Sequence, residues 1–149
     1  MRIQDQFTNQ QWANWFIGPP DHILLPAAKA LKGQQLGAVP TLVDHFVCYR
    51  VTDAPNVPVK ITLEDQFDAL LKKKEQVTEL VPKYLGVPAQ KIEPGGGKIL
   101  HADAHLAIYG IAPASDAVSF SARDQFNAWE SLSTVQALYL AVPALKTHV

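Results

Sequence analysis

The stretch that decides the fold is VKITLEDQF, residues 59–67. Over its first six residues, apolar and polar side chains alternate, which is the pattern of a β-strand with one buried face. The stretch ends in Asp-Gln-Phe, a tripeptide that occurs three times, beginning at Asp5, Asp65 and Asp124. These copies are spaced by 60 and 59 residues, so we infer that the chain repeats one structural unit.

Two further motifs recur with a similar spacing. Pro-Ala-x-Lys follows each Asp-Gln-Phe and ends at Lys29, Lys91 and Lys146. The segment HFVCY at residues 45–49 matches HLAIY at residues 105–109, whereas the first copy has no such segment. The first repeat is therefore incomplete.

The domain organisation follows from these motifs. We expect one domain over residues 1–149, with linkers whose Gly and Pro residues are typical of loops. The repeat copies span 1–29, 45–91 and 105–146, and the linkers between them span 30–44 and 92–104.

The alternating pattern predicts an all-β fold of three related units of about 60 residues with approximate symmetry, as a trefoil-like closed barrel or a compact sandwich. Residues 64–81 also fit a helix, but the matching part of copy one contains Pro19 and Pro20, so we predict strands there. Residues 133–140 are also predicted to form a strand. Because an incomplete repeat leaves sheet edges open, we expect a homo-oligomer or a multi-chain assembly.

The repeated polar residues have a structural interpretation. An Asp at a strand end accepts backbone N–H bonds, and the Phe two residues later fills the core. The alternative is that Asp5, Asp65 and Asp124 converge and hold a cation. The lysines of Pro-Ala-x-Lys are expected to lie over apolar surface or to pair with an Asp.

The segment HADAH, residues 101–105, gives the strongest indication of chemistry. In an extended strand, His101, Asp103 and His105 share one face and would present two imidazoles and a carboxylate to a metal ion. His45 is the counterpart of His105 and lacks such neighbours, which favours a structural histidine. A small metal-dependent enzyme is kept as one hypothesis.

Five aromatic residues form a candidate ligand surface. If exposed together, they would stack against a sugar or a partner protein, with help from the Asp-Gln positions. The alternative interpretation is that they are core aromatics of a β domain. The five residues are Trp12, Trp15, Trp129, Tyr84 and Tyr139.

Composition excludes several classes of protein. The net charge of −1 and a pI near 6.5 argue against nucleic-acid or anionic-membrane partners. Cys48 is the only cysteine, so neither an intrachain disulfide nor a cysteine-based zinc site can form. No stretch is apolar enough to span a bilayer, and the N-terminus lacks the apolar region of a signal peptide. Nothing in the sequence implies a cofactor.

The motifs of residues 45–91, His-Phe-x-Cys-Tyr, Leu-Glu-Asp-Gln-Phe and Pro-Ala-x-Lys, resemble an uncharacterised bacterial β-repeat family of predicted secreted proteins. The resemblance covers most of the chain apart from its linkers. It implies a disulfide in each copy; here Gly86 stands at the position that would pair with Cys48, and Ile108 and Ala141 replace the pair in copy three. It also implies a secreted or envelope-associated mature form without a leader, with a cytoplasmic location left open, and no defined activity.

Our main hypothesis is a non-catalytic structural or protein-interaction module. It rests on the repeats, the near-neutral charge and the absence of a recognisable catalytic constellation. The alternatives are the carbohydrate-binding module and the metal-dependent enzyme described above.

Overall fold

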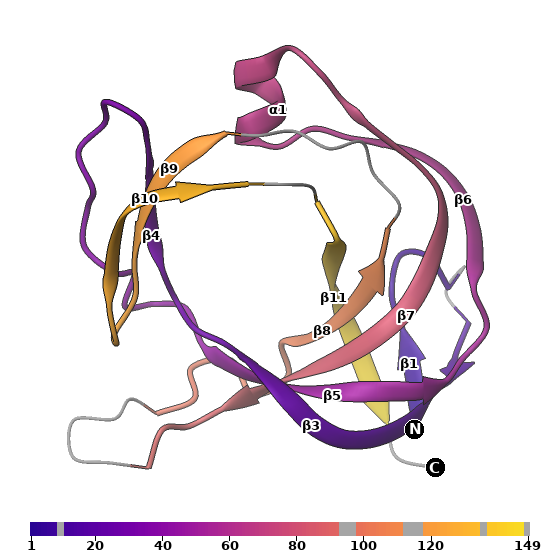
Figure 1. The fold of residues 1–149 in the computed structure, drawn as a ribbon. Coiled ribbons are helices and arrows are strands. Elements are labelled where there is room, and N and C mark those ends of the chain that lie inside the picture. Colours follow the sequence, from indigo (N-terminus) through magenta and orange to yellow (C-terminus); the bar gives the residue numbers. More distant parts are fainter. Residues whose placement is uncertain (9–10, 93–97, 112–117, 135–136, 148–149) are drawn as a thin grey trace.

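The structure is a computed structural model that describes residues 1–8, 11–92, 98–111, 118–134 and 137–147. It is all-β, with two antiparallel sheets and one short helix (Figure 1). The elements in chain order are β1 (Arg2–Gln4), β2 (Ala13–Asn14), β3 (Phe16–Leu24), β4 (Ala28–Leu31), β5 (His45–Asp53), β6 (Val57–Leu63), α1 (Gln66–Leu71), β7 (Glu75–Ala89), β8 (His105–Gly110), β9 (Ser119–Arg123), β10 (Ala128–Ser133) and β11 (Tyr139–Thr147).

The larger sheet has the strand order β2-β1-β11-β8-β7-β5-β3, and β6 pairs with the first part of the long strand β7. The smaller sheet has the order β10-β9-β4. Within the described residues, no pairing joins the edge strands β2 and β3, so the predicted trefoil-like closed barrel is wrong. Closure requires the last strand to pair with the first. Instead, the chain leaves β3 for β4, which belongs to the smaller sheet.

Copies two and three form their internal strand pairs in one register. The first strand of copy two, β5, pairs with its last strand, β7, so that His45 lies opposite Ala89. The first strand of copy three, β8, pairs with its last strand, β11, so that His105 lies opposite Ala144. Both pairs continue without a shift over six residues, which shows that these two copies use the same strand pairing.

The pairings between consecutive copies also match. The last strand of copy one, β3, pairs with β5, and His22 lies opposite Cys48. The last strand of copy two, β7, pairs with β8, and Tyr84 lies opposite Ile108. In both pairs the register shifts directly before this residue, so even the irregularity is repeated.

A third kind of strand pairing occurs twice and connects copies one and three. In the smaller sheet, Lys29 of β4 lies opposite Ala122 of β9. In the larger sheet, Lys146 of β11 lies opposite Ile3 of β1. Ala122 and Ile3 each precede the Asp of Asp-Gln-Phe by two residues, so the two pairings occupy equivalent positions.

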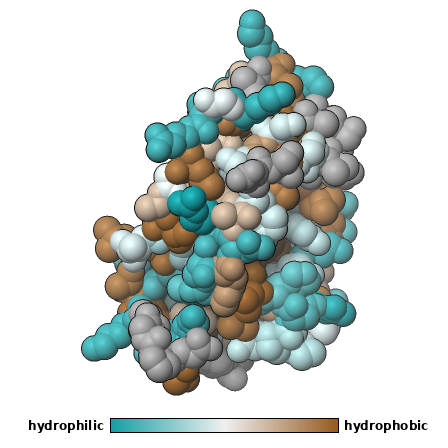
Figure 2. All heavy atoms as spheres, turned by 60° about the vertical axis from the view of Figure 1, so that its left-hand side comes forward, coloured by the Kyte–Doolittle hydropathy of each residue, from teal (hydrophilic) through white to brown (hydrophobic). Residues whose placement is uncertain are grey.

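The main hydrophobic core belongs to the larger sheet. Trp15, Tyr109, Ile3, Leu80 and Leu85 are fully or almost fully buried. Edge-to-face contacts join the ring of Tyr109 to Trp15 at 5.7 Å between centroids, and the cluster includes residues of β1, β7, β8 and β11. Among the described residues, none from the smaller sheet belongs to this cluster. On the side where β4, β9 and β10 lie, Figure 2 shows hydrophobic groups interspersed with hydrophilic ones.

The prediction of strands over residues 64–81 is wrong in its first part. The Asp65 carboxylate accepts the N–H of Phe67 at 2.7 Å, and this N-terminal cap begins α1. The helix stops before Lys72, whose φ of 56° lies in the left-handed region. The strand resumes at Glu75. No helix in the described part of the chain is both long and apolar enough to cross a membrane.

The prediction of a strand over residues 133–140 is correct only at its ends. Strand β10 ends at Ser133, and β11 begins at Tyr139. Residues 137–138 are not in a strand, and residues 135–136 lie outside the described part of the chain.

Candidate functional site

Three rings at the same position relative to the Pro-Ala-x-Lys motifs come together on one face of the larger sheet. His22, Tyr84 and Tyr139 each lie four residues before the Pro of Pro-Ala-x-Lys. The rings of His22 and Tyr84 are 5.0 Å apart, and those of Tyr84 and Tyr139 are 5.9 Å apart. Tyr84 precedes the core residue Leu85, so this row lies on the face opposite the main core. We call the three residues the aromatic ladder.

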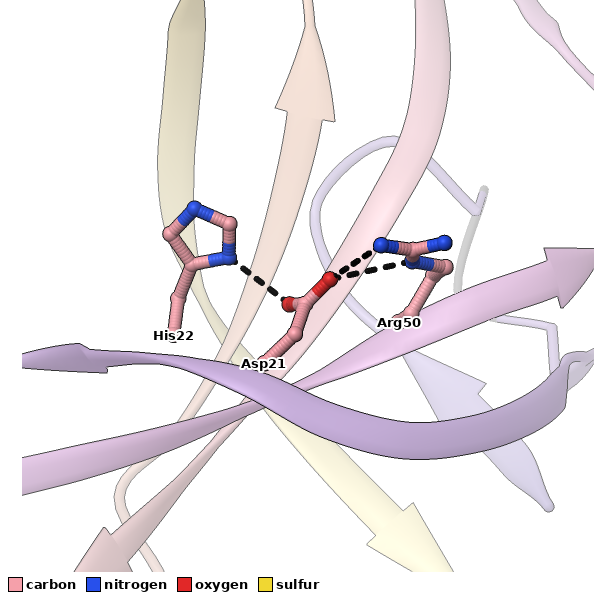
Figure 3. A network of polar contacts seen from close by, with 3 residues as sticks. All are labelled: Asp21, His22 and Arg50. Carbon is pink, nitrogen blue, oxygen red and sulfur yellow. Dashed lines mark hydrogen bonds and ion pairs between the residues drawn. The ribbon is translucent and has the colours of Figure 1, made fainter.

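A charged pair adjoins the ladder (Figure 3). The Asp21 carboxylate lies between the His22 ring and the Arg50 guanidinium, with His22 Nδ1 2.7 Å from Oδ1. Arg50 donates from Nε to Oδ2 at 3.0 Å and also from Nη2 to the same oxygen. Arg50 lies directly opposite Tyr84 in the β5–β7 pair, which places the ion pair beside the ladder.

The electrostatics of this group favour fixed charges over proton transfer. The hydrogen bond from His22, followed by that from Arg50, lowers the pKa of Asp21. The hydrogen bond to Asp21 raises the pKa of Arg50, and burial is the main cause that raises the pKa of Tyr84. Asp21 therefore stays ionised at neutral pH and is a weak base.

Cys48 lies opposite His22 but is not suited to be a nucleophile. Its side chain is buried, and burial raises the pKa of its thiol. A nucleophilic cysteine needs a lowered pKa and access to a substrate. We therefore interpret Cys48 as a packing residue beneath the ladder.

The five predicted aromatic residues do not form one surface. Trp15 is 2% exposed and belongs to the core, while Trp12 lies under the guanidinium of Arg2 and Trp129 belongs to β10 of the smaller sheet. Among the described residues, no ring contact joins these tryptophans to the ladder. Only Tyr84 and Tyr139 come together, and sequence reasoning missed their third partner, His22, although its position relative to Pro-Ala-x-Lys identifies it.

The ladder also differs from a flat stacking platform. Its interplanar angles are 63° between His22 and Tyr84 and 74° between Tyr84 and Tyr139. Rings in edge-to-face contact stabilise one another rather than presenting parallel faces to a ligand. The geometry therefore favours a packing role for the ladder over sugar stacking.

The predicted metal ligands His101, Asp103 and His105 do not converge. A turn at residues 102–103 separates the two histidines, so the extended strand that would place them on one face begins only at His105. His105 Nδ1 is 3.0 Å from the backbone oxygen of Asp103, and burial lowers the pKa of this histidine. The described residues contain no group of three or more side chains placed to hold a metal ion.

His101 instead contacts Asp44, which sequence reasoning did not single out. The buried Asp44 carboxylate accepts the backbone N–H groups of Leu100 and His101 at 2.7 and 2.8 Å. The bond from Leu100 is the main cause that lowers the pKa of Asp44. This carboxylate thus connects the ends of the two linkers, and the local sequence contains no signal of such a long-range contact.

The three repeated aspartates form the same local turn. The Oδ1 atoms of Asp5, Asp65 and Asp124 accept the N–H of the Phe two residues later at 2.8, 2.7 and 2.7 Å. The described residues do not bring the three carboxylates together around a cation position. The expectation that each Phe fills the core fails for Phe126, which is 64% exposed because its turn belongs to the smaller sheet.

Repeated lysines lie over the repeated phenylalanines of the next copy. Lys29 Nζ is 4.9 Å from the centre of the Phe67 ring, and Lys91 Nζ is 5.5 Å from the centre of the Phe126 ring. A cation over an aromatic face is attracted by the ring quadrupole. The Pro-Ala-x-Lys motif of one copy thus contacts the Asp-Gln-Phe motif of the next copy.

The repeated register, the shared Asp turns and the lysine–phenylalanine contacts define an all-β repeat protein. The chain belongs to the family described as "Repeat of unknown function (DUF7450)", whose model matches residues 1–148. No curated protein and no solved structure matches the chain.

Proposed function

We propose that the chain is a non-catalytic interaction module that joins β-strands of other polypeptides to its larger sheet, as part of a multi-chain assembly. The observation that carries this proposal is the common register of β5–β7 and β8–β11. In both places, the last strand of a copy pairs with the first strand of the same copy. Strand β3, the last strand of copy one, has no such partner within the described residues and forms an edge of the sheet.

Strand addition is a sufficient basis for binding. A strand that joins a sheet edge gains main-chain hydrogen bonds, and alternate side chains set its register. Natural proteins usually protect such edges with charges, prolines or covering loops. In β3, Pro19 and Pro20 protect the first part of the edge, whereas Ile23 and Leu24 are exposed on its last part, which favours use of that part by a partner strand.

The chemistry of the polar group also supports a non-catalytic role. Asp21 is held as an anion by His22 and Arg50, and the Cys48 thiol is buried. The secreted or envelope-associated setting remains part of the proposal and rests on the family resemblance. Detection of the native protein in the envelope or secreted fraction of its host cells would test that setting.

The test is a titration of the full chain, labelled with ¹⁵N, with synthetic peptides of its own strands. The peptides are residues 45–51, 57–63 and 119–123, and the readout is amide exchange at residues 22–25. We expect at least one peptide to slow exchange at these amides. An Ile23→Lys variant should weaken this effect because a charge protects an edge, whereas Leu42→Lys, at an exposed site outside any strand, should not. If no peptide slows exchange, the proposal is wrong.

A further inference from the structure

We infer that the outer edge of β3 binds one particular kind of strand: the His-x-x-x-Tyr first strand of a further repeat of this family, carried by another chain. The inference rests on the proposed function and names its partner. It is argued from strand order, register and exposure.

Strand order provides the first argument. Each first strand lies between two last strands, since β5 lies between β3 and β7, and β8 lies between β7 and β11. The last strand β7 reciprocally lies between two first strands. Figure 1 shows β3 along the margin of the sheet, with β5 on its inner side. Within the described residues no strand pairs with its other side.

Register provides the second argument and fixes where the partner lies. The His of a first strand pairs with the Ala of Pro-Ala-x-Lys in both complete copies, at Ala89 and Ala144. The equivalent residue after β3 is Ala27. In the same register, the Tyr of the incoming strand lies opposite Ile23, and the residue before that Tyr lies opposite Leu24.

Exposure provides the third argument. Ile23 is 60% exposed, whereas Leu85, its equivalent in copy two, is 0% exposed between two first strands. Leu24, the next residue of this edge strand, is 39% exposed. Burying such apolar surface favours association. The outer edge of β3 therefore offers apolar side chains to a strand with the His-x-x-x-Tyr pattern.

A second copy of this chain is not the donor. Its first strands, β5 and β8, are both already paired on their two sides. Donating either of them would break two strand pairs to make one. The partner is therefore a repeat whose first strand is free.

Disulfide trapping tests the register. The peptide of residues 45–51 carries a cysteine in the position of Cys48, which lies opposite Gly86 in the β5–β7 pair. The equivalent of Gly86 in β3 is Leu24. On air oxidation, we expect a Leu24→Cys chain to form a mixed disulfide with this peptide about tenfold faster than an Ile23→Cys chain, because cysteines on directly opposed positions are within bonding distance.

Two controls complete the design. A peptide with scrambled order and the same cysteine should trap slowly with both variants, and the native amide spectrum of each variant should be intact. Peptide mapping identifies the bonded cysteine, since the Cys48 of the chain itself is 1% exposed and protected.

The outcomes separate the two proposals. Equal trapping by Ile23→Cys and Leu24→Cys, or equal trapping of the scrambled peptide, overturns the inferred partner. The peptide of residues 57–63 could slow exchange at β3 while the peptide of residues 45–51 neither slows exchange nor becomes trapped. In that case the edge binds strands, but the inferred partner strand is wrong. If no strand peptide binds, the proposed function fails as well.

Discussion

Tyr109 is the residue on which the main core depends most. Its ring contacts Trp15 and Phe7, and its hydroxyl donates a hydrogen bond to Asp5 Oδ2. Burial, followed by the contact with Asp5, raises the pKa of Tyr109. Asp5 combines the local turn with a buried bond to Tyr109 of another repeat.

The Tyr109→Phe variant should be less stable by about 1–3 kcal/mol, because it leaves a buried carboxylate oxygen without its partner. Urea unfolding followed by fluorescence measures this loss. Tyr49→Phe is the matched control at the equivalent repeat position, since the described residues give the Tyr49 hydroxyl no hydrogen bond. Equal losses for both variants would contradict the importance of the Asp5 bond.

The pKa of Asp21 should lie below the ordinary value of an aspartate, because His22 and Arg50 donate hydrogen bonds to its charged form. A pH titration of the carboxyl carbon by ¹³C NMR measures it directly. Replacing His22 with Ala removes the largest cause and should move the pKa upward. An Asp21 pKa that is unchanged by this substitution would show that the contact is absent in solution.

In copies two and three, the first and last strands bring together the two positions between which the family resemblance implies a disulfide. Cys48 lies directly opposite Gly86, and Ile108 lies directly opposite Ala141. The pairing implied by the resemblance is therefore geometrically consistent, although only one of the four positions holds a cysteine. A Cβ at Gly86 would lie 3.1 Å from the Cβ of Leu106, so the copy-three pair is the better one to engineer.

The double variant Ile108→Cys with Ala141→Cys should form a disulfide on air oxidation, because opposed antiparallel residues lie at the separation that a disulfide needs. Thiol titration and mass spectrometry after oxidation measure it. Ile108→Cys with Val142→Cys is the matched control, since Val142 points to the other face. Preferential bonding in the control would mean that the register is shifted by one residue.

Asp44 stabilises the linker ends, and its contribution should depend on pH. Its pKa is lower in the folded state than in the unfolded chain, so the stabilisation is present above the unfolded pKa. It is lost as the pH falls through the folded pKa. Asp44→Asn should reduce the free energy of unfolding at pH 7 by about 1–2 kcal/mol, because the neutral amide accepts the two N–H bonds less strongly.

Urea unfolding at pH 7 and again near pH 3 measures this dependence. The wild type and Asp44→Asn should approach one another at the acidic pH, because Asp44 is then losing its charge. A stability difference of the same size at both pH values would contradict the proposed role of the charge.

The elements differ in how far they could be predicted. Alternation correctly identified the strand around residues 57–63, because one of its faces is polar. The helix at residues 66–71 was not predicted, because the part of copy one that matches residues 64–81 contains prolines. These prolines lie in strand β3, whereas residues 66–71 of copy two form α1. In β3, Pro19 and Pro20 are tolerated because they lie beside register shifts at a sheet edge.

At the scale of the whole molecule, the two sheets do not share the core equally. The core cluster consists of residues in or next to the larger sheet. Phe120 of the smaller sheet instead packs against Phe67 of α1. Regions with few buried apolar contacts open at lower free energy.

Hydrogen exchange should therefore show opening free energies for β4, β9 and β10 that are lower than those of β7 and β8 by roughly 1 kcal/mol or more. Residue-resolved exchange of the intact chain under native conditions measures this difference. Phe120→Ala should lower protection in the smaller sheet and leave β7 and β8 nearly unchanged. Uniform protection across both sheets would show that they unfold as one unit.

The repeat spacing was enough to predict the all-β class, but it could not predict the absence of closure. Whether a sheet closes depends on where its edge strands go, and β3 is followed by a turn into a separate sheet. Two of the three members of the aromatic ladder could be predicted as aromatic residues, whereas the third, His22, differs in residue type. Long-range contacts such as that between Asp44 and Leu100 leave no local pattern to detect.

The constant register has a consequence for how such a protein changes in evolution. Duplication of one complete unit would insert one first strand and one last strand, and each neighbouring strand would receive a partner of the same kind in the same register. The sheet would lengthen by a fixed step, and the row of rings would gain one member. In such a lineage the number of units can change while each added strand keeps the same pairing register.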